Sequence, residues 1–426
     1  MVMSASKDSF TSVWEKVTDI GGSDTQMACY LYLLHIWIKL TNADTEIMLR
    51  LYNIVWVLVA AWFLRKEPKI LLILMISPFF IYYINELRPY IMQIAAACGI
   101  SIFLYKKSLG AKQGYIQGFG LLFLLCTTSL TSVIWAIGFF SAWAVLEGRN
   151  FWSRKLFYAA AWWSVPFIGL GSYYLYTLLI GARATHIQSN GLVNIGASIY
   201  ELFGLTGLGP ARCELRLCTH LSDIVGQNGL LLALVGGLIT GIVLLLGLNA
   251  WRKRASNVIL VSLLALLIFP LSVFLYSSAM MSFRFSGRHF APILPLICII
   301  ISMGLRWHKK ALTHSILSTA FVLIWLTSNL YIRFDSTYAR EDYRGAIEYC
   351  KTKQNNGEIV LLLCNGSGKE YYGWDDNIDP QNWGQCQSIV VSRPDNYANI
   401  VKQIELSGTY HKRYLCPAFW TYEANK

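Results

Sequence analysis

Charged residues are scarce in this chain. Asp, Glu, Lys and Arg make up only 14% of its 426 residues, whereas hydrophobic residues make up 55%. A soluble domain contains about 25% charged residues. The sequence also lacks internal repeats and low-complexity linkers. No water-soluble fold could bury so much apolar sequence, so the composition excludes an ordinary soluble protein and favours an integral membrane protein.

The apolar residues fall into blocks of the length that a bilayer requires, about 17 to 25 residues for a helical span. Two blocks, 229–248 and 258–275, contain no charged residue. Helices are expected because backbone groups in lipid must be satisfied within the segment. The sequence predicts a mainly α, polytopic helical bundle of about ten spans, at 49–64, 70–84, 90–105, 115–130, 131–147, 156–180, 227–248, 257–277, 290–305 and 311–332.

Only the short polar stretch Thr127–Ser132 divides the fourth predicted span from the fifth. One long tilted helix with a re-entrant piece is the alternative. Basic residues favour the division, because Lys and Arg in short loops stay cytoplasmic and here recur after every second span. The clusters are Arg65, Lys66 and Lys69; Lys106, Lys107 and Lys112; Arg149, Arg154 and Lys155; Arg252, Lys253 and Arg254; and Arg306, Lys309 and Lys310. The net charge of +12 is therefore mostly a topology signal, and no nucleic-acid partner is expected.

This alternation predicts three domains. They are an outer segment with a juxtamembrane helix (1–48), a transmembrane helical domain (49–333) and a small extracytoplasmic α/β domain (334–426). In the last we expect helices at 342–353 and 396–406 and strands at 359–364 and 389–392.

The cysteines suggest disulfides on the outer side. An even number in an oxidising compartment is typical of crosslinks, although the pairing cannot be deduced and free buried thiols are the alternative. Four lie in the C-terminal domain and two in the outer loop 181–226: Cys350, Cys364, Cys386 and Cys416, and Cys213 and Cys218.

The N-terminal region has neither a signal peptide nor a span, although the topology places it outside. Residues 1–26 are polar, so we expect a membrane helix upstream in related proteins. Segment 27–40 is apolar but short for a span. Its Tyr and Trp residues favour a helix lying in the membrane interface.

Ionisable groups at the ends of spans are the best functional candidates, because they are costly in or near lipid. All of them are predicted on the outer side, which favours a shared pocket. They are Glu86 and Arg88 between the second and third spans, Arg284, Arg288 and His289 at the start of the ninth, and Asp24 before the juxtamembrane helix. The simpler alternatives are a local ion pair for Glu86 and Arg88, snorkelling arginines at the ninth span, and a helix N-cap for Asp24.

These residues occur in motifs that resemble the GT-C membrane glycosyltransferases, which include bacterial aminoarabinose transferases and protein O-mannosyltransferases. The segments are 24–40 (D-x-H-P-P-L-Y-Y-L-L-L-H-x-W-x-K/R in the family), 82–90 (Y-Y-S-Q-E-x-R-x-Y), 287–295 (R-Y-x-x-P-x-x-P) and 341–344 (D-W/Y-R). Their order along most of the chain carries the resemblance. Two features depart from it: the family's first helix with its outer Asp-Glu pair has no counterpart, and Gln26-Met27-Ala28 replaces H-P-P.

The resemblance implies transfer of a sugar from a polyprenyl-phosphate donor to a hydroxyl of a lipid, glycan or protein. The location implied is the outer face of a membrane, as in the bacterial inner membrane. Asp24 and Glu86 are then the carboxylates that act as base or hold a divalent metal ion, and these roles stay open. Arg88 and Arg288, helped by Arg284 and His289, are expected to bind the donor phosphate, because a guanidinium donates two parallel bonds to it.

Two other functions remain open. A transporter or flippase of lipid-linked glycans would also be polytopic, but it should carry ionisable or broken-helix sites at mid-membrane in both halves. The second open function is that of a catalytically inactive relative of the family, because the family's outer Asp-Glu pair has no counterpart in this chain.

Overall fold

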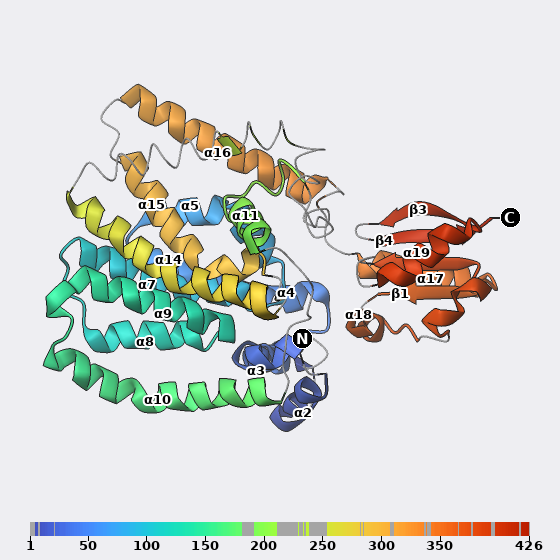
Figure 1. Cartoon of the computed structure of the whole chain (residues 1–426), viewed down its shortest axis with the longest axis horizontal. Helices are drawn as coiled ribbons and strands as arrows, with labels where there is room; N and C mark the ends of the chain where they lie inside the picture. The colour runs from blue at the N-terminus through green and yellow to red at the C-terminus, as the bar shows by residue number, and fades with distance from the viewer. Residues whose placement is uncertain are drawn as a thin grey trace. The chain divides into compact units, whose positions relative to one another are not determined.

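The structure is a computed structural model, and it describes most of the chain. The described residues are mostly helical with one small sheet (Figure 1). They are 5–6, 9–20, 22–180, 191–210, 229, 233, 236–237, 254–281, 283, 285–306, 311–335, 338, 342–364, 366–375, 378–392, 397–416 and 419–425. The predicted span 227–248 therefore lies almost entirely outside the described residues, as do Cys213 and Cys218.

The chain divides into two compact units. The first ends at Asn329 and is helical, whereas the second includes Leu330–Lys426 and holds the sheet. The helical elements of the first unit are α2 (Phe10–Ile20), η1 (Gly22–Met27), α3 (Ala28–Thr41), α4 (Glu46–Leu64), α5 (Pro68–Ile76), α6 (Pro78–Ile84), α7 (Tyr90–Ser108), α8 (Tyr115–Cys126), α9 (Leu130–Glu147), η2 (Gly148–Asn150), α10 (Arg154–Leu179), α11 (Gly191–Leu202), α14 (Arg254–Met281), η3 (Gly287–Ile293), α15 (Leu294–Arg306) and α16 (Ala311–Phe334), which crosses the boundary.

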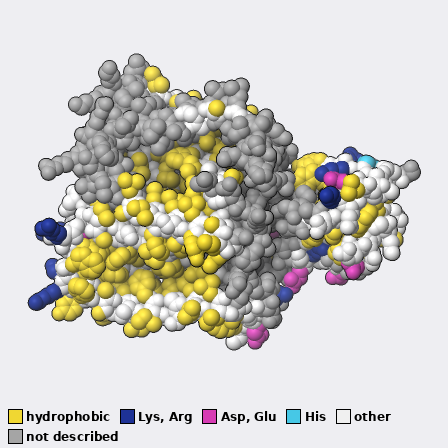
Figure 2. All heavy atoms as spheres, in the orientation of Figure 1, with side chains coloured by type: hydrophobic (Ala, Val, Ile, Leu, Met, Phe, Trp, Pro, Cys, Tyr) yellow, Lys and Arg dark blue, Asp and Glu magenta, His cyan; other side chains and the backbone are white. Residues whose placement is uncertain are grey.

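Three described helices are long and apolar enough to cross a membrane: Glu46–Leu64, Leu130–Asn150 and Leu264–Met281. Their apolar side chains are not all inside the protein. On α10, Trp162 and Val165 are 73% and 75% exposed, and Figure 2 shows apolar side chains across a broad face of the helices. A contiguous exposed apolar face of this kind would be unfavourable in water and marks an interaction surface.

Helix α7 lies at the centre of the first unit. Every residue from Tyr90 to Tyr105 is buried, and apolar residues lie on all sides of the helix, with Gln93 and Ser101 as polar exceptions. Such a helix is expected only in the middle of a bundle. Small residues at 95–97 and at Gly99 let the neighbouring helices α4, α8 and α9 pack around it, and Figure 1 shows α8, α9 and α14 running alongside. The packing of α7 on all sides therefore fixes the position of the turn that precedes it, between α6 and α7.

The predicted span 70–84 is wrong as one continuous helix. Helix α5 ends at Ile76 and α6 begins at Pro78, with Ser77 in an extended conformation (φ −62°, ψ 123°). The reason is Pro78, which has no N–H to donate and disfavours the helical conformation in the residue before it. The apolar sequence continues through this point, so hydrophobicity alone does not indicate the break.

The polar stretch after residue 126 does divide two helices. Ser129 caps α9, because its hydroxyl accepts a hydrogen bond from the Ser132 N–H at 3.3 Å. Gln93 of α7 donates its side-chain N–H to the same hydroxyl at 2.8 Å. The stretch is thus held by the central helix, and the alternative of one long helix is wrong.

The other predicted spans within the described part of the chain correspond to helices. Span 49–64 lies in α4, 90–105 in α7, 156–180 in α10, 257–277 in α14, 290–305 in η3 and α15, and 311–332 in α16. The predicted helix 27–40 corresponds to α3. Helices α10 and α14 continue through Pro166 and Pro270.

The second unit contains a four-stranded mixed sheet in the order β1-β2-β4-β3. Strands β1 (Val360–Leu363) and β2 (Ser388–Ser392) are parallel, whereas β4 (Phe419–Ala424) pairs antiparallel with β2 and with β3 (Tyr410–Cys416). The helical elements are α17 (Tyr343–Asn355), α18 (Gly366–Tyr371), η5 (Pro380–Gln385) and α19 (Ala398–Ser407). The predicted helices 342–353 and 396–406 and strands 359–364 and 389–392 correspond to α17, α19, β1 and β2, whereas β3 and β4 were not predicted. Strand β3 is a largely exposed edge strand that lacks an apolar alternation.

Among the described cysteines of this unit there is no disulfide, so the expected crosslinks are wrong for Cys350, Cys364, Cys386 and Cys416. Cys350 and Cys364 lie in the apolar cluster on one face of the sheet, and Cys386 lies in the cluster on the other face. Burial raises the pKa of Cys350 and of Cys416 to about 12. These thiols therefore stay protonated and act as small packing residues.

Candidate active site

The turn between α6 and α7 carries two of the predicted site residues, Glu86 and Arg88. Two backbone hydrogen bonds close it: the Glu86 N–H donates to the Tyr83 carbonyl at 3.0 Å, and the Arg88 N–H donates to the Glu86 carbonyl at 2.7 Å. Pro89 ends the turn and precedes the first residue of α7. Proline is suited to a helix start, since its missing N–H would have had no partner inside the helix.

Asn53 of α4 holds this turn from the side. Its amide group donates to the carbonyls of Ile84 and Glu86, both at 2.8 Å, and its side-chain oxygen accepts from the hydroxyl of Tyr30 on α3 at 3.2 Å. Asn53 is completely buried. Burial raises the pKa of Tyr30 well above its usual value, so the phenol stays protonated and remains a donor. Sequence reasoning missed Asn53, although an amide in the middle of an apolar span is itself a signal.

Glu86 and Arg88 form an ion pair within the turn. The Arg88 Nε lies 3.7 Å from Glu86 Oε1, and the side chains are 36% and 18% exposed, respectively. The sequence-based alternative of a local pair for these residues is therefore correct as geometry. It does not exclude a binding role, because the guanidinium is 36% exposed and carries five N–H donors.

A second carboxylate, which sequence reasoning missed, lies close to the same turn. Glu201 near the end of α11 is buried, and its Oε2 accepts a hydrogen bond from the Tyr83 hydroxyl at 3.2 Å. Tyr83 precedes Glu86 by one helical turn. The signal was present: Asn194, Ser198 and Glu201 recur at helical spacing in an apolar segment and are all buried.

Glu201 also contacts η3, the element with the arginine and histidine of the ninth predicted span. Gly287 packs so closely that a methyl group on it would lie 2.4 Å from Glu201 Oε2. The structure thus brings the α6–α7 turn and η3 to the same buried carboxylate, through Tyr83 on one side and Gly287 on the other.

Within η3, His289 has a structural role. Its Nδ1 accepts the Ser286 N–H at 3.0 Å in a reciprocal cap at the start of the helix, and its carbonyl accepts from Trp135 Nε1 at 2.6 Å. These bonds hold the imidazole ring and the backbone of His289 in place. Arg288 is different: its Nε is buried and has no hydrogen-bond partner among the described residues.

The remaining predicted residues, Asp24 and Arg284, lie partly or wholly outside the described residues. The backbone of Asp24 lies in η1, next to Thr25, whose carbonyl accepts a hydrogen bond from Tyr173 of α10, but the Asp24 side chain lies outside the described part of the chain. Arg284 also lies outside it. Within the described ranges, no three His, Cys, Asp or Glu side chains gather as metal ligands, so a divalent ion at Asp24 or Glu86 stays a prediction.

Gly287→Ala should disturb the contact between η3 and Glu201. The new Cβ would meet Glu201 Oε2 at 2.4 Å and Glu201 Cβ at 2.6 Å, and such overpacking costs about 1 to 3 kcal/mol. We expect a lower midpoint of thermal unfolding in detergent. Gly169→Ala is the matched control, since nothing lies within 4 Å of a Cβ at that helical position. An equal midpoint for both variants would contradict the close packing.

Comparisons with protein-family models, with curated proteins and with solved structures find no match for this chain.

Proposed function

We propose that the chain is a multi-pass membrane glycosyltransferase that moves a sugar from a polyprenyl-phosphate donor to an acceptor hydroxyl on the outer face of the membrane. One observation carries the proposal. Tyr83, Glu201 and Gly287 form a buried contact between α6, which leads into the Glu86–Arg88 turn, and η3, which bears Arg288. The contact therefore connects segments far apart in the sequence, which carry two carboxylates (Glu86 and Glu201) and two guanidinium groups (Arg88 and Arg288).

The chemistry of glycosyl transfer matches this set of groups. The acceptor hydroxyl attacks the anomeric carbon and must lose a proton, for which a carboxylate is a suitable base. The lipid phosphate departs with negative charge, which guanidinium groups stabilise through paired hydrogen bonds. We assign the phosphate to Arg88 and Arg288, with Arg284 and His289 as helpers. Glu86 is our candidate base, with Asp24 as the other carboxylate from the sequence motifs.

Glu201 enters the proposal as a positioning residue. Its carboxylate accepts the Tyr83 hydroxyl and packs on Gly287, so it links the two elements that carry the arginines. A buried carboxylate between two such elements would also oppose the repulsion between their positive charges. We therefore assign to it the spacing of Arg88 and Arg288 and not proton transfer.

The decisive experiment follows two labels on one donor. Purified protein in vesicles is given polyprenyl-phosphate sugars with ³H in the lipid and ¹⁴C in the sugar, together with lipid, glycan and protein acceptors. A transferase separates the labels, and ¹⁴C appears in an acceptor fraction while ³H remains as polyprenyl phosphate.

A flippase of lipid-linked glycans would give a different pattern in the same assay. Both labels would stay on one molecule and become accessible on the other side of the vesicle. That result, or intact donor with every sugar in the panel, would overturn the proposal. Glu86→Gln is the internal check, since it should abolish the separation of the labels if the Glu86 carboxylate is the base.

A further inference from the structure

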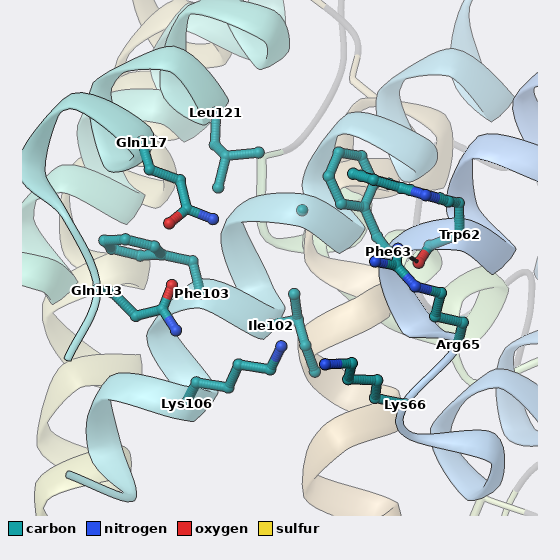
Figure 3. A pocket seen from close by; sticks show the side chains of 11 residues that line it. Trp62, Phe63, Arg65, Lys66, Ile102, Phe103, Lys106, Gln113, Gln117 and Leu121 are labelled. Atoms are coloured by element: carbon teal, nitrogen blue, oxygen red, sulfur yellow. Dashed lines mark hydrogen bonds between the residues drawn. The ribbon is translucent and has the colours of Figure 1, made fainter. Parts of the chain in front are cut away.

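A cavity of about 150 Å³ lies where α4, α7 and α8 meet, at the ends that carry basic loops. This is the opposite end of α7 from the Glu86–Arg88 turn, so the cavity is separate from the candidate active site. Figure 3 shows its side chains pointing toward a shared hollow. The lining residues are Trp62, Phe63, Arg65, Lys66, Gly99, Ile102, Phe103, Lys106, Gln113, Gln117 and Leu121.

The floor of the cavity is apolar. Ile102 and Phe103 are 6% and 1% exposed, and Phe63 and Leu121 close in from the neighbouring helices. Gly99 allows this approach, because a methyl group on it would lie 2.7 Å from a Leu121 carbon and 3.0 Å from Phe63. The cavity therefore has a shaped wall of hydrocarbon.

The rim is basic, and its charge is not compensated by the described residues. No described carboxylate pairs with Arg65, Lys66 or Lys106. The neighbouring Lys107 behaves differently, since it forms a salt bridge with Glu147. The difference means that the three rim cations remain available for an anion, while Lys107 belongs to the protein's own packing.

One rim cation is already oriented. The Arg65 guanidinium donates to the Trp62 carbonyl at 2.7 Å and lies over the Trp62 ring, 4.4 Å from its centroid. This stacking holds the group while leaving other N–H donors unused. Gln113 and Gln117 line the opposite wall and add neutral donors (Figure 3).

An exposed apolar face leads from the cavity along α4. It consists of Leu51, Ile54, Val55, Leu58 and Trp62, which are between 38% and 64% exposed and recur at helical spacing. Trp62 belongs both to this face and to the cavity lining. A ligand that fills the site should therefore have a phosphate-like head and a long hydrocarbon tail, because a free phosphate would leave the apolar wall and the helix face uncovered.

We propose that this cavity binds the headgroup of an anionic phospholipid, with the phosphate among Arg65, Lys66 and Lys106 and an acyl chain along the exposed face of α4. The positive-inside rule explains why basic residues lie at these helix ends, but it does not require them to line one cavity. Here cations from the turn after α4 (Arg65 and Lys66) and from the last turn of α7 (Lys106) surround one apolar floor. Basic pockets between membrane helices are suited to lipid phosphates, since attraction to the headgroup and burial of the chain act together.

The test measures lipid binding to the purified full chain in detergent by native mass spectrometry. The probes are phosphatidylglycerol, phosphatidylcholine with the same acyl chains, and inorganic phosphate as competitor. The site variant is Arg65→Gln/Lys66→Gln/Lys106→Gln. The matched control, Lys69→Gln/Lys112→Gln/Arg149→Gln, removes the same three charges from exposed positions that do not line the cavity.

We expect phosphatidylglycerol to bind the wild type and the control variant at least about 10-fold more tightly than phosphatidylcholine. The site variant should bind both lipids equally. Gln117→Trp, which fills the mouth of the cavity from an exposed position without changing charge, should weaken phosphatidylglycerol binding in the same way.

Three results would overturn the inference. They are equal binding of the two lipids to the wild type, full phosphatidylglycerol binding by the site variant and by Gln117→Trp, and displacement of the lipid by inorganic phosphate at equal concentration. The last would identify a soluble phosphate site. None of these results depends on sugar transfer, so the proposed function is tested separately.

Discussion

Arg88→Ala is expected to lower the rate of sugar transfer by about 10²- to 10³-fold, the usual effect of removing one group that stabilises charge in a transition state. The Arg88 guanidinium is 36% exposed beside Glu86, so it can reach a lipid phosphate at the membrane surface. Arg88→Lys should restore only part of the rate, because an ammonium keeps the charge but loses the planar fork. The measurement is release of ³H-labelled polyprenyl phosphate from the donor.

Two controls separate this role from a structural one. Arg149→Ala removes an exposed arginine from η2 and should leave the rate within roughly twofold, in line with the small effects of surface substitutions. The second control is the midpoint of thermal unfolding of Arg88→Ala in detergent, which should stay close to that of the wild type because the Glu86–Arg88 pair is partly exposed. A transfer rate of Arg88→Ala within about twofold of the wild type would show that the phosphate assignment is wrong.

Asn53→Leu is expected to lower the rate by about 10²-fold although this residue is too deeply buried to meet the substrate. Leucine has a similar size but cannot bond the carbonyls of Ile84 and Glu86, each now held at 2.8 Å, or the hydroxyl of Tyr30. A shift of about 1 Å in the turn would suffice for a loss of this size. Each buried group left without a partner should also cost about 1 to 3 kcal/mol of stability.

A graded comparison identifies Asn53 as a positioning residue. Tyr30→Phe removes only the hydroxyl that donates a hydrogen bond to the Asn53 side-chain oxygen. This loss should lower the free energy of unfolding by about 1 kcal/mol and reduce the transfer rate only a few-fold. For Asn53→Leu we expect kcat to fall more than the affinity for the donor, since the phosphate still meets Arg88. Transfer and thermal unfolding of Asn53→Leu that match the wild type would show that the turn does not depend on this residue.

Local patterns in the sequence predicted much of the helical architecture. The lengths of the apolar runs gave most of the helices, and the polar stretch at 127–132 separated α8 from α9. These features are local. A helix buried in lipid or in a bundle needs an apolar segment of a certain length, and a capping residue or a proline affects only the helical turn in which it lies. The same reasoning did not recognise the break at Pro78, since the apolar run continued across it.

The position of Glu86 and Arg88 in an exposed turn was also predictable, because ionisable residues between two apolar runs have few other places to lie. The sequence could not predict which buried residues hold this turn and the helix before it in place. Asn53 lies 33 residues from Glu86, and Glu201 lies 118 residues from Tyr83, so no periodicity within one segment connects them.

The amino-acid sequence by itself determined that this chain is apolar, mainly helical and basic at the ends of alternate helices. Only the tertiary structure decided that Tyr83, Glu201 and Gly287 meet, that the cysteines of the sheet lie on opposite faces, and that Arg65, Lys66 and Lys106 surround an apolar hollow. The physical reason is that composition and periodicity fix which surface of each element is apolar, whereas packing between distant elements fixes which polar groups become neighbours.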